Sequence, residues 1–179
     1  IEDAAEAHGA KFYDKMIGNL SDISCFSFYA NKVLTSGEGG MVCTNNTNYY
    51  KKVNLLKNLG FEKPRFIHNI LGFNFRMSGM QAALGLSQLK EVKKIVIKKI
   101  KIAKLYKSQL KDLKNIIFAK EEKNSKNIYW QVGIRIKGNL KNRLVKHLKK
   151  NGVDIRDFFF SMRNQPCLKK FIPKKVPET

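Results

Sequence analysis

The polar and apolar positions of this chain divide it into short apolar stretches that predict β-strands and longer stretches with helical spacing. Residues 1–3 have the character of a strand end, and residues 23–29 are rich in β-branched and aromatic side chains. A third strand is predicted at residues 41–44, and others at 116–119, 128–136 and 153–155. A short helix is predicted over residues 4–8, between the first two strands. Asp3 is suited to cap it, and Gly9 would end it.

Helical spacing predicts four longer helices. The first covers residues 46–59 and ends at Gly60, and the segment from 61 to 75 has few periodic apolar positions and is predicted to be a loop. Ser78, followed three residues later by Gln81, has the pattern of a capping box and starts a helix that continues to about Leu89. Further helices are expected over residues 93–113 and 140–151.

The order of these elements predicts the fold class. Alternating strands and helices in the first half indicate an α/β domain, whereas the second half has the composition of a smaller α+β unit. We therefore expect a large α/β domain over residues 1–92 and an incomplete small domain over residues 93–179. Because the chain opens at Ile1 without a linker and closes at 174–179 without a terminating element, we interpret it as an internal segment of a longer protein.

Charge and cysteine content narrow the class of protein. The net charge of +21 would favour binding to a polyanion such as nucleic acid. However, the lysines are spread along the predicted helices, and the sequence has no zinc-finger pattern and no aromatic RNA-binding motif. We therefore predict no nucleic-acid partner, although a phosphorylated substrate fits the charge.

Three cysteines without a CxxC pair favour a reduced, cytoplasmic protein. Apolar runs stay below the roughly 20 residues that a bilayer requires, so no membrane association is expected.

The most informative stretch is residues 25–40, because it places one lysine in an unusual setting. Lys32 follows an aromatic segment and precedes a turn of small residues, whereas most other lysines lie in polar helices. Partial burial favours the neutral, nucleophilic form of an amine, as a lysine that reacts with a carbonyl group requires. A lysine in a loop is more often a solvated surface residue, so the neighbouring residues decide between the two interpretations.

Three neighbours of Lys32 have side chains or backbone suited to an anionic, ring-containing ligand. The Ser27 hydroxyl could donate to a phosphate, or bond its own backbone as strand serines do. The glycine-rich run at residues 36–40 could bring backbone amides close to an anion, or form only a tight turn. Asp3 could hold a protonated pyridine nitrogen, or only cap the following segment.

Several blocks, in the correct order and spacing, resemble the DegT/StrS family of nucleotide-sugar aminotransferases. The blocks are residues 2–10, 26–32 with 37–42, 72–77 with 81–85, Tyr129–Trp130, and 152–156. The family consists of fold-type I enzymes that depend on pyridoxal 5'-phosphate (PLP). The resemblance implies the large PLP-binding domain of that fold, a mixed sheet with flanking helices, followed by the smaller α+β domain.

The resemblance also implies a role for each site residue. Lys32 matches the lysine that holds the cofactor covalently and shuttles protons, Asp3 the carboxylate on the pyridinium nitrogen, and Ser27 the hydroxyl on the cofactor phosphate. With that nitrogen protonated, the ring serves as an electron sink. Asn74 matches an asparagine that reaches the partner subunit's cofactor phosphate, so a homodimer with shared active sites is implied. No metal ligands are proposed.

Glu6 departs from many relatives, which have glutamine beside the cofactor's ring oxygen. A carboxylate there would be repelled by a phenolate unless it were protonated or compensated. The same run is similar to the perosamine-synthase branch of the family, which aminates C4 of GDP-4-keto-6-deoxymannose with L-glutamate as donor, in surface polysaccharide (O-antigen) synthesis. The dehydratase branch has histidine in place of the lysine, so Lys32 argues against it.

Three further positions concern the sugar substrate, and His68 and Arg163 are candidate substrate residues. Ser161 and Arg163 stand where relatives usually have proline and histidine in a loop near the substrate, which puts the choice of sugar in doubt. His68 resembles a histidine of perosamine synthases and is a candidate substrate residue; otherwise it only packs the loop.

Three alternatives remain open from the sequence. The enzyme could act on another keto-sugar, the chain could be a non-catalytic paralogue of the same fold, or it could be a basic nucleic-acid binder. Because the segment that precedes these blocks in the family supplies the aromatic residue stacked on the cofactor, we expect this chain alone to bind PLP poorly and to be inactive.

Overall fold

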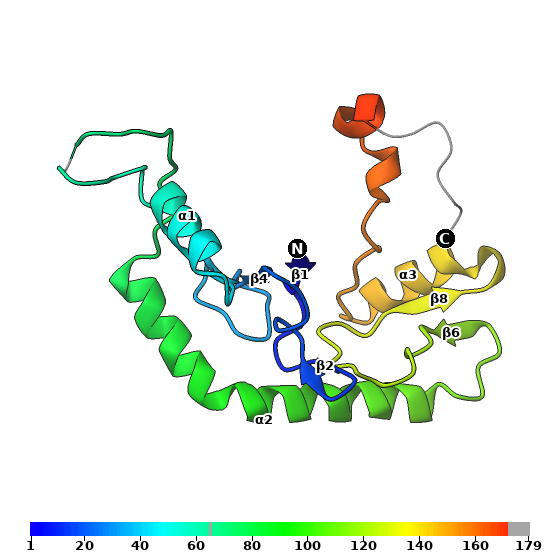
Figure 1. Cartoon of the computed structure of the whole chain (residues 1–179). Coiled ribbons are helices and arrows are strands. Elements are labelled where there is room, and N and C mark those ends of the chain that lie inside the picture. The colour runs from blue at the N-terminus through cyan, green and yellow to red at the C-terminus, as the bar shows by residue number, and fades with distance from the viewer. Residues whose placement is uncertain (65, 172–179) are drawn as a thin grey trace. The chain divides into compact units, whose positions relative to one another are not determined.

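The computed structural model describes residues 1–64 and 66–171, which form two compact units (Figure 1). The first unit comprises residues 1–113 and 119–132, and the second comprises residues 114–118 and the chain from residue 133 onward. The boundary expected after residue 92 lies inside a helix of the first unit and stays a prediction for the whole protein. The expectation about residues 174–179 lies outside the described residues.

A three-stranded mixed sheet organises the first unit. Strand β4 (Ser24–Ser27) is central, with β1 (Glu2–Asp3) parallel to it on one side and β5 (Gly40–Cys43) antiparallel on the other. In this register Asp3 pairs with Cys25, and Ser27 lies two residues further toward the same end of the sheet. The α/β class and the mixed sheet expected from the resemblance are confirmed. The sheet places Asp3 and Ser27 near the same end of two neighbouring strands.

A second small sheet was not predicted. It consists of β2 (Lys11–Phe12), β3 (Lys15–Met16) and β7 (Ser125–Lys126), in the order β3-β2-β7. Each strand has two residues, too few to show a period of two in the sequence. The sheet joins the start of the chain to a segment more than 100 residues later, a pairing that local patterns cannot reveal.

The helix predicted over residues 4–8 is wrong. The segment forms successive turns, in which the Ala7 amide donates to Ala4 O at 3.0 Å and the Ala10 amide donates to Ala7 O at 2.9 Å. The Ala4 amide donates instead to Cys25 O on the neighbouring strand, at 2.9 Å. Tertiary pairing therefore outweighs the helix propensity of the alanines.

Two helices complete the first unit. Helix α1 (Thr47–Lys57) begins after Asn46, whose side chain accepts hydrogen bonds from the amides of Asn48 and Tyr49 at 2.9 and 3.1 Å. Helix α2 (Gly79–Gln109) has 31 residues and replaces the two helices predicted there. The predicted break near residues 90–92 is wrong because that stretch contains neither glycine nor proline, so the backbone bonds continue.

The capping box that starts α2 is present, and its removal should weaken the helix. The Gln81 amide donates to Ser78 Oγ at 3.3 Å, and the Ser78 amide donates to Gln81 Oε1 at 2.9 Å. Ser78→Ala is expected to lower the stability of the first turn by about 0.5–2 kcal/mol, because a backbone amide loses its partner. Hydrogen exchange of residues 79–82 would measure the effect; Ser87→Ala, a change inside the helix, is the control.

The core of the first unit joins three segments that are distant in sequence. Val33, Val96 and Ile128 are buried, with partly buried apolar residues packed against them, namely Ala10, Val92, Ile95, Ile100 and Trp130. The loop that carries Lys32 is thereby fixed to α2 and to the segment before the second unit. No helix among the described residues is long and apolar enough to cross a membrane.

The second unit pairs β6 (Ile116–Phe118) with β8 (Ile134–Ile136) and contains α3 (Lys141–Lys150), with 3-10 turns at Gly138–Leu140, Met162–Asn164 and Pro166–Phe171. The strand predicted over residues 128–136 is only partly correct, because Ile128 enters the core of the first unit and Tyr129 has a φ of 52°. The strand predicted at 153–155 is wrong. There the Val153 amide donates to Leu148 O at 2.9 Å and closes the end of α3.

Candidate functional site

Lys32 lies in a closed loop between β4 and β5. The loop is tied at its base, where the Phe28 amide donates to Gly39 O at 2.8 Å and the Ser36 amide donates to Phe28 O at 2.9 Å. The Lys32 amide donates to Tyr29 O at 3.0 Å, which forms a turn at the lysine itself. Val33 and Leu34, directly after it, are 3% and 7% exposed and anchor the turn in the protein. The backbone of Lys32 is therefore held by both hydrogen bonds and burial.

The side chain of Lys32 is covered, with 9% of its surface exposed. Its Nζ forms an ion pair with Oε1 of Glu6 and lies 4.4 Å from the centre of the Trp130 ring. The partial burial expected from the sequence is found, whereas the pairing with a carboxylate was not expected. Glu6 faces the amine that would carry the cofactor, so Lys32 itself supplies a positive charge beside the unusual carboxylate.

Asp3 and Ser27 have hydrogen-bonding capacity left for a ligand. Asp3 Oδ1 accepts from the Ala5 amide at 3.1 Å, and Oδ2 has no hydrogen bond among the described residues. Ser27 Oγ accepts from the Tyr29 amide at 3.3 Å, which leaves its O–H proton to be donated. A carboxylate and a hydroxyl donor therefore lie on the neighbouring strands β1 and β4, and a covered amine lies in the loop that follows β4. This donor set fits the pyridinium, phosphate and carbonyl groups of PLP.

The glycine-rich run after Lys32 forms a tight turn, as one of the two interpretations proposed. Gly37 and Gly39 have φ values of 81° and 138°, which side-chain-bearing residues rarely adopt. A Cβ on Gly40 would lie 2.7 Å from Phe26 O, so β4 and β5 can pair there only through glycine. The role of this run toward a phosphate stays a prediction.

His8 is a buried residue of the site that the sequence did not single out. It is 7% exposed, and its ring lies 5.3 Å from that of Phe26 and 5.9 Å from that of Phe28. Neither ring nitrogen has a hydrogen-bond partner among the described residues. Burial lowers the pKa of His8, and the positive charge of Lys32 lowers it further, while Glu6 opposes the shift. His8 is therefore neutral in the folded protein at neutral pH.

The neutral state of His8 predicts how stability depends on pH. The unfolded chain binds a proton at His8 below its ordinary pKa of 6.5, whereas the folded protein does so only at lower pH. Stability should therefore decrease as the pH falls below 6.5 toward the folded pKa. His8→Leu is expected to reduce this decrease, measured as thermal midpoints across that range, whereas His147→Leu, on α3, is the matched control. An equal loss in both variants would contradict the assignment to His8.

Within the described part of the first unit, neither Asn74 nor His68 contacts Lys32. Asn74 forms a β-bridge with Asn58, and its Oδ1 accepts from Arg76 Nε at 2.8 Å. The exposed His68 bonds through Nδ1 to Leu59 O at 2.7 Å. Arg163 lies in the second unit, where its amide donates to Ser161 Oγ at 3.3 Å. Among the described residues, these contacts are local to the loops that carry the three side chains.

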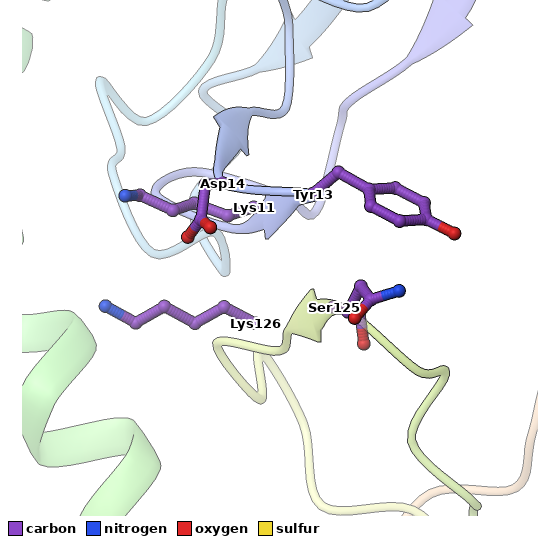
Figure 2. A pocket seen from close by; sticks show the side chains of 6 residues that line it. Lys11, Tyr13, Asp14, Ser125 and Lys126 are labelled. Atoms are coloured by element: carbon purple, nitrogen blue, oxygen red, sulfur yellow. The ribbon is translucent and has the colours of Figure 1, made fainter.

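A separate pocket lies beside the paired strands β2 and β7 of the small sheet (Figure 2). It has a volume of about 450 Å³ and is lined by Lys11, Tyr13, Asp14, Asn124, Ser125 and Lys126. Lys11 and Lys126 are direct partners across the two strands, and their side chains extend toward the same side. No predicted site residue lines this pocket.

Trp130 and His8 are the neighbours of Lys32 that sequence reasoning missed as site residues. Trp130 is 98 positions away, and only its place beside Tyr129 in a family-like block marked it. His8 lies in the block that contains Asp3 and Glu6, where its position among apolar residues was the available signal. Both become site residues only through tertiary packing, which brings β4, the loop that carries Lys32 and the segment around Trp130 together.

The fold defines the class of protein. The structure superimposes on the Helicobacter pylori PseC structure, an aminotransferase involved in the biosynthesis of pseudoaminic acid, with a TM-score of 0.88 and 26% identity. That match covers 98% of this chain and 49% of the other. A comparable match to the DesV structure from S. venezuelae has a TM-score of 0.85 and 26% identity, and covers 96% and 46% of the two chains. The fold is that of aminotransferases.

Sequence comparison identifies the family. The model of the DegT/DnrJ/EryC1/StrS aminotransferase family matches residues 1–179, and the chain belongs to this family, whose members are PLP enzymes. The GDP-perosamine synthase of Escherichia coli O157:H7 is 36% identical over 168 residues, which cover 93% of this chain and 46% of that protein. The chain thus spans about half the length of the curated relatives it matches. The resemblance recognised in the sequence is confirmed.

Proposed function

We propose that this chain is part of a PLP-dependent aminotransferase that moves an amino group from L-glutamate to a nucleotide-linked keto-sugar. The observation that carries the proposal is the covered amine of Lys32, held between a carboxylate and an indole ring. Its loop follows the strand that ends at Ser27, and that strand pairs with the one that carries Asp3. When bound, PLP supplies an electron sink for the carbanion formed at the reacting carbon. Lys32 would bind the cofactor's carbonyl group and move the proton, Asp3 would hold its ring nitrogen, and Ser27 would donate to its phosphate.

The proposed sugar substrate is GDP-4-keto-6-deoxymannose, aminated at C4 for surface polysaccharide. The run Glu2 to Ala7 and the identity of about one third to GDP-perosamine synthases support this choice. His68 is a proposed substrate residue because it resembles a histidine of perosamine synthases, and Arg163 is another because it stands at the histidine position of a loop that lies near the substrate in the family. Another keto-sugar is the second candidate, because Ser161 and Arg163 depart from the family pattern.

We further propose a cytoplasmic homodimer with shared active sites. The support is the match of Asn74 to an asparagine that acts across the subunit interface in this family. Free Cys25, Cys43 and Cys167 are consistent with a reducing compartment.

The experiment that tests the function uses the full-length protein loaded with PLP. L-glutamate should convert the cofactor to its amine form, seen as loss of the visible absorption band, and GDP-4-keto-6-deoxymannose should restore that band. Mass spectrometry should then detect the GDP-linked 4-amino sugar. A UDP-linked keto-sugar is the control substrate, and its preferential conversion would favour the second candidate. A full-length protein that binds no PLP would contradict the proposal and favour a non-catalytic paralogue.

A further inference from the structure

We propose that Trp130 is a positioning residue that holds the Lys32 side chain in the site through the face of its indole ring. This inference rests on the proposed function, because it concerns the lysine assigned to the cofactor. Trp130 lies in the segment after α2, 98 positions from Lys32, and no local sequence pattern links the two residues.

The first line of support is the contact itself. Lys32 Nζ lies 4.4 Å from the centre of the Trp130 ring, within the range in which a cation is attracted to an aromatic face. Glu6 approaches the same amine. With 9% of its side chain exposed, Lys32 is held between a carboxylate and a ring rather than moving freely in solvent.

The second line of support is that Trp130 also holds the backbone beside Lys32. Its Nε1–H donates to Asn31 O at 2.8 Å, directly before the lysine. The Trp130 carbonyl in turn accepts a hydrogen bond from Lys99 Nζ on α2, at 3.0 Å. One residue therefore contacts both the amine and the peptide that carries it, and is itself fixed to the long helix.

The segment around Trp130 is anchored on both sides. Ile128 is 2% exposed and packs with Val33, the residue after Lys32. The Tyr129 hydroxyl donates to Glu121, and Lys107 Nζ donates to the Tyr129 oxygen at 2.9 Å and to Glu121 Oε1 at 2.5 Å. These contacts leave the indole little freedom to move away from the lysine.

The proposed reaction explains why a contact between Lys32 and the Trp130 ring would be useful. A lysine that is released from the cofactor and then moves protons must remain close to the reacting atoms, although its flexible side chain has many rotamers. A ring face attracts the ammonium group without a directional hydrogen bond, so the amine can leave it and return. Trp130 would thus limit the positions of Lys32 while it is an ammonium group, and the amine becomes nucleophilic once that group has given up its proton.

The test compares Trp130→Phe and Trp130→Leu in the full-length protein, with Tyr106→Leu on α2 as the control. In the cofactor-free protein, acetylation of Lys32 is measured by peptide mass spectrometry relative to Lys94, whose side chain is 78% exposed. Trp130→Leu is expected to raise this ratio about tenfold and Trp130→Phe much less, since a phenyl ring keeps the aromatic face. In the loaded enzyme, Trp130→Leu should lower kcat with the KM for L-glutamate unchanged.

The outcomes separate this inference from the proposed function. Wild-type ratios and kcat in Trp130→Leu would overturn the positioning role. A loss in Trp130→Phe as large as that in Trp130→Leu would overturn the role of the ring face, because both variants lose the Nε1–H hydrogen bond to Asn31 O. If Trp130→Leu fails to fold, Trp130→Met replaces it, because methionine keeps apolar bulk without the ring. A wild-type protein that binds no PLP contradicts the proposed function, while the acetylation ratio still decides whether Trp130 holds Lys32.

Discussion

Replacing Lys32 with alanine in the full-length protein is expected to abolish covalent attachment of PLP and to reduce amino transfer by about 10²–10⁴-fold or more, because both the nucleophile and the proton-transfer group are lost. The variant should still fold, since Val33 and Leu34 anchor the loop through their own burial. After borohydride reduction, peptide mass spectrometry should find the cofactor on Lys32 in the wild type and on no lysine of the variant.

The matched control is Lys94→Ala, which removes an exposed lysine of α2 whose ion-pair partner within the described part of the chain is Glu91. It should keep full activity and the cofactor adduct at Lys32. A Lys32→Ala protein that retained the visible absorption band of a covalently held cofactor, or wild-type turnover, would contradict the assignment.

The second large effect is expected at Ile128, which lies in the core beneath the lysine loop. Ile128 is 2% exposed and packs with Val33 and Val96, so truncation to alanine leaves a cavity at the junction of three segments. Ile128→Ala should cost about 2–5 kcal/mol, and Ile128→Val about 0.5–1.5 kcal/mol. Because Trp130 is two residues away, Ile128→Ala should also make the Trp130 ring, which packs over the Lys32 amine, more mobile.

Hydrogen exchange of the amides at residues 33–36 and 128–130 measures this effect locally. A local measurement is preferable because the chain has two compact units, which need not unfold in a single two-state transition. Ile97→Ala, on the α2 surface with 56% of the residue exposed, is the control and should change exchange little. Equal protection in Ile128→Ala and wild type would show that this core does not hold the site together.

The sequence predicted much of the local structure because local physics determined it. The strand at residues 24–27, the helix after Asn46 and the capping box at Ser78 depend on side chains within a few positions of one another. The predicted break in α2 and the helix at residues 4–8 were wrong for opposite reasons. In α2 no residue interrupts the backbone bonds, whereas at residues 4–8 the chain is drawn into pairing with a distant strand.

By itself, the sequence determined the family, the mixed α/β class and the set of chemical groups at Asp3, Ser27 and Lys32, since these depend on residue types at fixed spacing. Only the tertiary structure decided what surrounds the lysine. Glu6 is 26 positions before Lys32 and Trp130 is 98 positions after it, and both reach its amine because a parallel strand pair and a shared core fold these segments together. Contacts between residues so far apart arise from packing, which no local pattern of side chains records.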